Sequence, residues 1–299
     1  MESKFPKISI VTASFNQGKF IEETIQSFLN QNYPNLEYII IDGGSTDQTL
    51  EIIKKYQQHL TYWVSENDEG QANAINKGLN KCTGEIFNWL NSDDYLEHGA
   101  LYKIAKAFED KKVSLVAGRV RNFSTTADEI IPNQKLSAQG LMCWEPGVKF
   151  VQPGVWMRRE LIEQCGGIDE KFHYAFDWDL YIRYLYCFPQ VKEIDDLLVH
   201  FRLHENSKTH SLLERFAIEE REIIEKIYAL DVYPLLKERC LYKIQKTNWT
   251  SYLSDLSNAN ISIIKKFLAV IKSMPDYSKV SYSRQTAGAL KAFAMGKII

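Results

Sequence analysis

The sequence predicts an α/β fold in which a mostly parallel sheet is flanked by helices and followed by a helical C-terminal extension. Strand-like apolar runs and helix-like apolar spacings alternate along residues 1–95, and repeated β-α units of this kind form parallel sheets with crossover helices. Acidic clusters directly follow two of the predicted strands, at the sheet edge where such folds bind ligands. Beyond residue 211, every strong periodicity is helical.

The first part of the chain contains four predicted strand–helix units. Each strand is a short apolar run, and each helix has apolar residues at three- and four-residue spacing. Asp47 follows Ser45 and Thr46 and is expected to cap the second helix rather than to contact a ligand. The strands are expected at residues 7–13, 36–42, 61–65 and 85–90, and the helices at 19–31, 47–56, 71–80 and 99–109.

The pattern changes from residue 113 onward. Two strand-like runs joined by a polar stretch predict an antiparallel pair at 115–123 and 129–131. Residues 135–147 are expected to be loop with a short helix, and Gly166-Gly167 is a helix stop. The remaining predicted elements are helices at 159–165, 177–186, 212–230 and 261–273 and a strand at 191–199.

The charge distribution excludes a generally basic nucleic-acid binder. The formal net charge is −2, but residues 1–239 hold 27 Lys and Arg against 36 Asp and Glu, whereas residues 240–299 hold 9 against 2. The predicted sheet region is therefore acidic, and the end of the helical extension is basic.

Cysteine usage and the start of the chain predict a cytoplasmic protein. The five cysteines are scattered and none forms a C-x-x-C pair, as expected for small core residues in a reducing compartment. Residues 1–7 are polar and lead straight into a strand, so no signal peptide is expected. No apolar run approaches the ~18–20 residues that span a bilayer.

Two acidic strand ends are the main candidates for a ligand site. Asp42 follows the apolar run 38–41, and Asp93 and Asp94 follow the apolar run 86–90. In a parallel sheet both clusters would lie at the edge that binds ligands. They suit a ligand with a hydrogen-bond donor at one end and a divalent cation at the other, and a metal-bound nucleotide diphosphate has both.

Five segments carry a family resemblance, in order along the chain. They are ISIVTASFNQGKFIEETIQSFLNQ, LEYIIIDGGSTDQTLEII, SENDEGQANAINKGLNKCTGEIFNWLNSDDYL, QPGVWMRRELIEQCGGIDEKFHYAFDWDLYIRYL and FRLHENSKT. Together they span residues 8–209, roughly two thirds of the chain, and resemble family 2 glycosyltransferases of the GT-A fold. The resemblance implies a catalytic domain at 1–210, with a nucleotide-binding half at 1–96 and an acceptor-side half at 97–210, before the extension at 211–299.

The resemblance also implies an activity. An inverting, metal-dependent hexosyltransferase would move a sugar from a nucleotide diphosphate sugar, with a UDP-sugar as the expected donor, to a hydroxyl acceptor. The acceptor would be a saccharide or a lipid-linked saccharide, in bacterial cell-surface polysaccharide or glycolipid synthesis, and nucleic acid would not be a partner. The implied cofactor is Mn²⁺ or Mg²⁺.

The family's acidic residue at the position of Asp42 accepts a hydrogen bond from a ring N–H of the base. Gly43 and Gly44 would let the backbone approach the ligand closely. Glu66 and Asp68 lie on the loop where relatives contact the donor. The other expected nucleotide-binding residues are Thr12, Ala13, Ser14, Asn16, Gln71, Asn91 and Ser92.

Asp93 and Asp94 are the expected metal ligands, because a divalent cation stabilises the negative charge of a departing diphosphate. By the resemblance, His204 is the third metal contact. Mixed imidazole and carboxylate ligation favours Mn²⁺. Many relatives carry Asp where this chain has Asn91, so a direct contact of Asn91 with the metal is in doubt.

Asp177 is the expected general base, at the start of a helix whose dipole favours carboxylates. Relatives usually have an acid where this chain has Phe176. Asp179 either faces the acceptor or pairs with Arg183. Core packing explains the two tryptophans of the acceptor side as well as sugar stacking does. The expected acceptor-side residues are Gln152, Trp156, Trp178 and Asp179.

Other readings stay open at this point. A catalytically inactive nucleotide-sugar-binding partner subunit would account for Asn91 and Phe176. A dehydrogenase is disfavoured because no G-x-G-x-x-G follows the first strand. The amphipathic, lysine-bearing segment 261–273 suggests either peripheral contact with the inner face of a membrane or packing on the catalytic domain.

Overall fold

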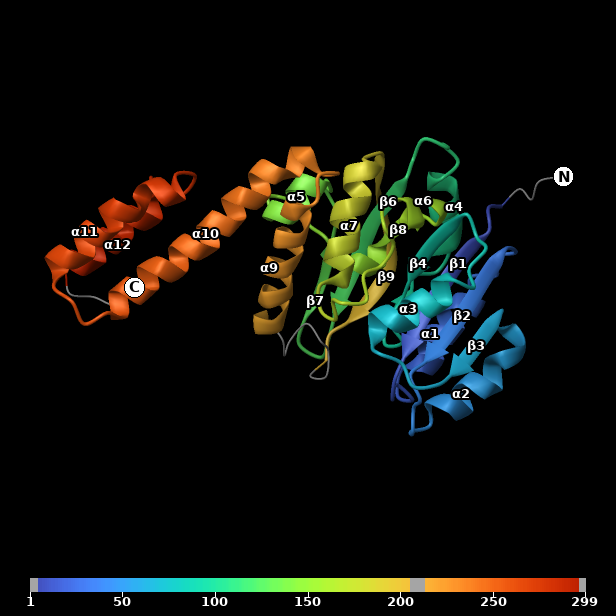
Figure 1. Ribbon diagram of the computed structural model, residues 1–299. Helices are drawn as coiled ribbons and strands as arrows, with labels where there is room; N and C mark the ends of the chain where they lie inside the picture. The colour runs from blue at the N-terminus through green and yellow to red at the C-terminus, as the bar shows by residue number, and fades with distance from the viewer. Residues whose placement is uncertain (1–4, 205–212, 296–299) are drawn as a thin grey trace. The chain divides into compact units, whose positions relative to one another are not determined.

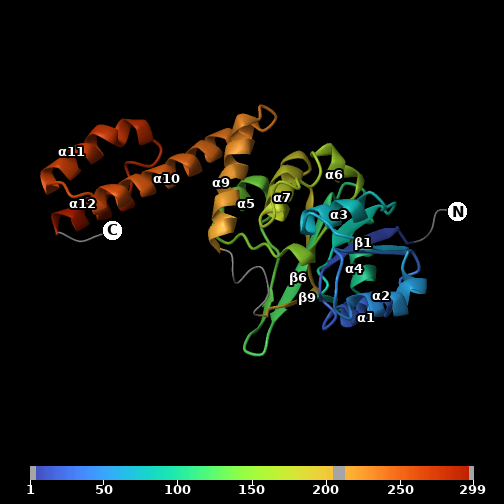
Figure 2. The ribbon, with the colours of Figure 1, turned by 60° about the horizontal axis from the view of Figure 1, so that its bottom comes forward.

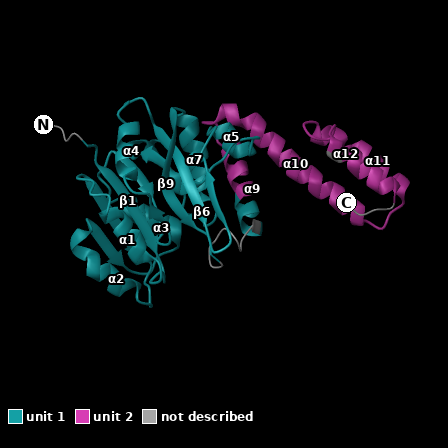
Figure 3. Ribbon diagram, turned by 180° about the vertical axis from the view of Figure 1, so that it is seen from behind, with its two compact units in different colours: residues 1–219 teal, residues 220–299 magenta. Residues whose placement is uncertain are grey.

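The computed structural model describes residues 5–204 and 213–295, so positions 205–209 of the FRLHENSKT motif lie outside the described residues. The chain divides into two compact units, residues 1–219 and 220–299 (Figure 3). The boundary predicted after residue 210 differs from this division, which falls inside a single helix, α9 (Leu213–Ala229).

The first half of unit 1 is a parallel α/β sheet with the strand order β3-β2-β1-β4 (Figure 1). Its elements follow the prediction closely, because each is a buried apolar strand or an amphipathic helix. The strands are β1 (Ile8–Ser14), β2 (Leu36–Asp42), β3 (Tyr62–Ser65) and β4 (Ile86–Trp89), and the helices are α1 (Ile21–Leu29), α2 (Thr49–Tyr56), η1 (Gln57–His59) and α3 (Gln71–Leu79).

The second half of unit 1 extends the same sheet with mostly antiparallel neighbours. Beyond β4 the order is β8-β6-β9-β5, and β7 pairs with the last four residues of β6, farther along that strand than β8. Among the described residues of this half, only β6 and β9 pair in parallel. The sheet is therefore mixed, and its parallel character is concentrated in the first half. The strands are β5 (Tyr95–Leu96), β6 (Leu115–Phe123), β7 (Asp128–Ile131), β8 (Val155–Arg158) and β9 (Val191–Arg202).

Two of these strands, β5 and β8, were not predicted. Each is too short to show a period of its own, and each forms because a neighbouring strand offers backbone partners. The expected antiparallel pairing of β6 with β7 is confirmed. The helices of this half are α4 (Ala100–Ala107), α5 (Ala138–Cys143), η2 (Gln152–Gly154), α6 (Glu160–Gln164) and α7 (Phe176–Cys187).

Helices cover both faces of the parallel region. The side chains of Ile8, Ile10 and Ile40 share one core cluster with residues of α1, α2 and α4. Helix α3 packs on the opposite face, where a Cβ added to Gly78 would lie 2.5 Å from Cγ1 of Val11 (Figure 2). Because both faces are covered, the strands are apolar on both sides instead of alternating with polar residues.

Unit 2 consists of helices with a small core of its own. That core contains Trp249, Leu253, Val270 and Phe293, and Trp249 Nε1 donates a hydrogen bond to Thr286 at 2.8 Å. In the described parts of the chain, no helix has the length and apolarity needed to cross a membrane. Beyond α9, the elements are α10 (Pro234–Asn258), α11 (Ile263–Ser273), η3 (Met274–Tyr277) and α12 (Arg284–Ala294).

Candidate active site

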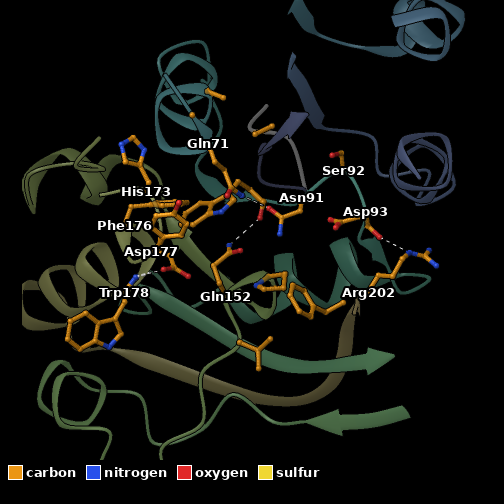
Figure 4. Close-up of a pocket in the computed structure, with 18 of the residues that line it drawn as sticks. Gln71, Asn91, Ser92, Asp93, Gln152, His173, Phe176, Asp177, Trp178 and Arg202 are labelled. Carbon is orange, nitrogen blue, oxygen red and sulfur yellow. Dashed lines mark hydrogen bonds between the residues drawn. The ribbon is translucent and has the colours of Figure 1, made fainter. Parts of the chain in front are cut away.

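A cavity of about 800 Å³ lies beyond the carboxyl ends of β1 and β4 and beside the start of α7. Figure 4 shows Asp93 with Arg202 at one end of it and Asp177 with Trp178 at the other. Polar residues of the central strands and aromatic residues of the second half form the wall between them. The lining includes Ala13, Ser14, Phe15, Asp68, Gly70, Gln71, Trp89, Asn91, Ser92, Asp93, Trp144, Gln152, His173, Tyr174, Phe176, Asp177, Trp178, Arg202 and Phe216.

The expectation that Asp42 meets a nucleotide base is not supported by its surroundings. Its side chain is 0% exposed and is not part of the cavity lining. Oδ2 accepts hydrogen bonds from the Gly44 and Ser45 amides at 3.1 and 2.9 Å and from Ser65 Oγ at 2.7 Å, and Oδ1 accepts one from Ser45 Oγ at 2.5 Å. Asp42 therefore organises the turn after β2 and ties it to β3.

Two other expected nucleotide contacts also support the loops. Asn16, with a φ of 52°, accepts a hydrogen bond from the Thr46 amide at 2.9 Å and so joins the loop after β1 to the loop after β2. Thr12 is buried and accepts a hydrogen bond from Tyr38 Oη at 3.2 Å. Asp47 lies one residue before Gln48, the N-cap of α2; its Oδ1 accepts the N–H of Thr49, the first helical residue, at 2.9 Å, and its Oδ2 accepts the Gly18 N–H at 3.0 Å.

The remaining residues expected on the nucleotide side do line the cavity: Ala13, Ser14, Gln71, Asn91 and Ser92. Gln71 Nε2 donates to Asn91 Oδ1 at 2.6 Å, which joins the start of α3 to the loop after β4.

Asp68 is the carboxylate that lines the cavity beside the turn after β2. A Cβ added to Gly43 would lie 2.8 Å from Asp68 Oδ2, so a side chain at position 43 would displace the Asp68 carboxylate. Asp68 Oδ1 accepts a hydrogen bond from the Gly70 amide at 2.8 Å. Asp68, and not Asp42, is therefore the carboxylate of this region that a ligand in the cavity can reach.

The expected metal ligands separate into two groups. Asp93 lines the cavity, and its Oδ2 lies 2.8 Å from His204 Nε2, whose ring stacks on Phe20 with ring centroids 5.1 Å apart. Asp94 is fully buried and outside the lining, and its Oδ1 accepts the Arg202 backbone N–H at 2.9 Å. Asp94 therefore attaches the end of β9 to the loop that carries Asp93.

Asp94 is buried beside a second carboxylate, that of Asp93. Burial, and after it the charge of Asp93, raises the pKa of Asp94 well above its usual value. Asp94 Oδ2 is buried and accepts no hydrogen bond from the described residues. A cation bound at Asp93 would offset this charge.

The side chains at this end of the cavity could hold a divalent cation only if a bound ligand supplied further oxygen atoms to the metal. Among the described residues, no group of three His, Cys, Asp or Glu side chains is placed to hold a metal ion. Mg²⁺ commonly binds through one or two carboxylates together with substrate phosphates. Asp93 provides such a carboxylate at the cavity with His204 Nε2 beside it, whereas Asp94 lies outside the cavity lining.

Arg202 contacts several segments of the chain at the Asp93 end of the cavity. Its Nε donates to the Asp93 backbone carbonyl at 3.0 Å, and its guanidinium carbon lies 4.7 Å from the ring centroid of Phe123 and 5.1 Å from that of Phe20. The strand end, the acidic loop and α1 are thereby joined through one side chain.

The expected base, Asp177, lines the opposite end of the cavity in the first turn of α7. Its Oδ1 accepts the Trp178 N–H at 2.7 Å, so the carboxylate is fixed at the start of the helix. Carboxylates are stabilised at a helix N-terminus.

The four residues expected on the acceptor side have different environments. Gln152 and Trp178 line the cavity. Trp156 is buried in the core cluster, and Asp179 is buried and bonded to Arg183 Nε and Nη2 at 3.0 and 2.6 Å. Trp156 and Asp179 are therefore structural, and the alternative of pairing Asp179 with Arg183 is confirmed.

Several lining residues were not identified from the sequence. Trp144 is 44% exposed and stacks on Trp178 with ring centroids 6.2 Å apart and planes at 12°. Phe15, His173 and Phe216 complete the aromatic parts of the wall. The sequence offers no signal for these four residues, because they come from separate segments of the chain and share no spacing.

Comparisons with known proteins agree with this geometry. The sequence profile of the family described as "Glycosyl transferase family 2" matches residues 9–166. An uncharacterized glycosyltransferase of Rickettsia typhi is 28% identical over 234 residues, which cover 73% of this chain and 70% of that protein.

Solved structures show the same fold. The S. aureus TarS 1–349 structure in complex with UDP-GlcNAc superposes with a TM-score of 0.67 at 17% identity, covering 97% of this chain and 92% of that one. The mannosyltransferase PcManGT of Pyrobaculum calidifontis, in complex with GDP-Man and Mn²⁺, gives a TM-score of 0.61 at 18% identity, covering 98% and 86%. At these identities the likeness establishes the fold, which is that of GT-A enzymes.

Asp42→Asn should lower the free energy of unfolding by roughly 2 kcal/mol or more, because one carboxylate oxygen that accepts buried hydrogen bonds becomes an NH₂ donor. Asp68→Asn is the matched control and should change stability by less than about 1 kcal/mol, since an amide oxygen still accepts the Gly70 N–H. Urea unfolding of both variants measures the difference. Equal stability of the two would contradict the structural role of Asp42.

Proposed function

The chain belongs to glycosyl transferase family 2, and from that premise we propose that it transfers a sugar from a nucleotide diphosphate sugar to a hydroxyl acceptor with inversion. The observation that carries this proposal is the placement of Asp93 and Asp177 at opposite ends of one cavity (Figure 4). A single displacement requires this separation, because the acceptor hydroxyl and the leaving diphosphate occupy opposite faces of the sugar.

The donor would lie between the loop after β1, Asp68, and the Gln71–Asn91 pair. We propose a UDP-sugar. In this arrangement Asp68 would accept a hydrogen bond from a ring N–H of the base, and the side chains of Gln71, Asn91 and Ser92 would surround the ribose and the diphosphate.

Asp93 and His204 would hold a divalent cation, Mn²⁺ or Mg²⁺, together with the diphosphate oxygens. The cation supplies Lewis-acid neutralisation of the charge that develops on the leaving group. Asp94 and Arg202 keep Asp93 in place through the Arg202 backbone and side-chain hydrogen bonds.

Asp177 would act as the general base. As the acceptor oxygen forms its bond to the anomeric carbon, the bond from that carbon to the diphosphate oxygen breaks, and its electron pair leaves with the diphosphate. The acceptor proton moves to the Asp177 carboxylate.

The acceptor would be a saccharide, free or lipid-linked, in cell-surface polysaccharide or glycolipid synthesis. The wall beside Asp177 is aromatic, with Trp144 partly exposed and parallel to Trp178. Flat aromatic faces of this kind pack well against the C–H faces of sugar rings.

We further propose peripheral membrane contact through α11. On this helix Phe267 and Val270 face the unit 2 core, whereas Ile264, Leu268 and Ile271 are 71%, 61% and 59% exposed. The exposed stripe repeats every three to four residues, and α11 carries basic but no acidic side chains. Such a helix can lie in an anionic lipid interface, where each nearby lysine contributes about 1 kcal/mol.

Asp93→Asn should lower turnover by about 10²-fold or more and remove the Mn²⁺-dependent part of UDP binding, because the ion loses its carboxylate. Asp94→Asn should have the smaller effect, since Asp94 acts through the chain. The measurements are UDP release from nucleotide sugars and thermal stabilisation by UDP with and without Mn²⁺. Asp195→Asn, on the surface of β9, is the control. Undiminished turnover of the wild-type chain in the presence of a chelator would contradict the proposed role of the divalent cation.

Asp177→Asn should lower turnover by about 10²-fold or more with donor affinity nearly unchanged, because the base is lost while the nucleotide side of the cavity stays intact. Steady-state kinetics and donor binding measure the two effects separately. If donor binding falls as far as turnover, Asp177 is a donor contact. If the wild-type chain binds nucleotide sugars without turning any over, the alternative of an inactive binding subunit is correct.

The triple variant Ile264→Ser, Leu268→Ser, Ile271→Ser should lose co-sedimentation with phosphatidylglycerol-containing vesicles, because the apolar face that enters the interface is removed. Phosphatidylcholine vesicles should bind the wild-type chain weakly at low salt. Ile130→Ser, which alters an exposed isoleucine on β7, is the matched control. Absence of lipid-dependent pelleting of the wild-type chain would contradict the membrane contact.

A further inference from the structure

The segment that leads into α7 is held by one carboxylate from another helix. Glu219 Oε1 accepts the His173 N–H at 2.9 Å, and Glu219 Oε2 accepts the Tyr174 and Ala175 N–H groups at 2.8 Å each. Three consecutive backbone donors therefore converge on a single side chain of α9. Hydrogen bonds to a charged acceptor are about twice as strong as neutral ones.

The start of α7 has no side-chain cap of its own, and the Glu219 carboxylate lies next to it. Ala175 occupies the N-cap position of α7 and has no side chain that could accept a hydrogen bond. The first N–H groups of a helix lack partners within the helix, and alanine is a poor N-cap. Glu219 accepts the N–H groups of the three residues that end at this N-cap, and it places its negative charge near the positive end of the α7 dipole.

Two neighbours of Glu219 on α9 contact the same segment. Arg215 Nη1 donates to Tyr174 Oη at 2.7 Å, and the Phe216 ring meets that of Trp178 edge-on with centroids 6.4 Å apart. Positions 215, 216 and 219 lie on one face of a helix, because residues three and four apart are neighbours there. The start of α9 therefore contacts the chain from Tyr174 to Trp178.

The segment held in this way contributes a large part of the cavity wall. His173, Tyr174, Phe176, Asp177 and Trp178 all line the cavity, as Figure 4 shows for four of them. Asp177 is two residues beyond the last amide that Glu219 binds, in the first turn of α7. A shift of this segment would move the carboxylate of Asp177 with it.

We propose that Glu219 is a positioning residue for the transfer reaction: it fixes segment 173–175 and thereby holds Asp177 where it can take the acceptor proton. This inference rests on the proposed function, in which Asp177 is the base. Displacement of a reacting group by about 1 Å can lower a rate by 10²-fold. The first turns of α9, beyond the catalytic domain expected from the sequence, are on this view part of the catalytic apparatus.

The full-length Glu219→Gln variant tests the hydrogen bonds without changing the side-chain shape. The amide keeps one acceptor oxygen, and its NH₂ group faces a backbone donor. Glu214→Gln is the matched control, because Glu214 lies on the same helix and is exposed. Hydrogen exchange followed by mass spectrometry should show the amides of residues 173–175 exchanging at least tenfold faster in Glu219→Gln, and unchanged in Glu214→Gln. Unchanged exchange in Glu219→Gln would overturn the proposal.

A kinetic measurement separates positioning from a merely structural role. With UDP-GlcNAc and GDP-mannose as probes, kcat for nucleotide release should fall tenfold or more in Glu219→Gln, while the Kd for UDP with Mn²⁺ stays within twofold. Equal losses of kcat and of UDP affinity, or an unchanged kcat, would overturn the proposal. Glu219→Asp, which keeps the charge but shortens the side chain, should be intermediate in both exchange and kcat, and serves if Glu219→Gln does not fold.

Failure of the proposed function would look different. A wild-type chain that releases no nucleotide from either probe contradicts the transferase activity with those donors, whereas the exchange experiment still decides whether Glu219 fixes the segment before α7.

Discussion

The parallel pairing of β1, β2 and β3 is the constraint on which the nucleotide side of the site depends. The register places Ser14 opposite Asp42 and Asp42 opposite Ser65, so the three strands end in one row. The chain must leave all three strands at the same edge. Asp42 joins the row by accepting hydrogen bonds from its own turn and from Ser65. Residues of the loops after β1 and β3, among them Phe15 and Asp68, line the cavity.

The aspartates named above form two sets, one that is buried and anchors loops and one that lines the cavity. Asp42, Asp94 and Asp179 are completely buried and bind backbone amides or an arginine. Asp93 and Asp177 line the cavity, where a ligand can meet them. A buried carboxylate is stable only when hydrogen bonds or an opposite charge compensate its desolvation. The buried set therefore indicates where loops are anchored, and the cavity set indicates where chemistry can occur.

The two ends of the cavity are built by different parts of the chain. The Asp93 end depends on β9, which returns Arg202 and His204 to the loop after β4. The Asp177 end depends on α7 and on Glu219 of α9. Because each end is anchored by segments far apart in sequence, the distance between Asp93 and Asp177 is set by the packing of unit 1 as a whole.

The sequence by itself determined the alternation of strands and helices, the acidic strand ends and the family, since each depends on residues close together in the chain or on a motif in fixed order. The sequence could not tell that Asp93 and Asp68 line the cavity whereas Asp94 and Asp42 are buried outside it. These carboxylates are chemically identical and differ only in their burial and in the hydrogen-bond donors around them. The roles of Trp144, Phe216 and Glu219 likewise come from elements that meet only in the folded protein. The short strands β5 and β8 form because a partner strand is present. Tertiary structure decided these points because burial and hydrogen-bond partners are set by long-range packing, which leaves no periodic trace in the sequence.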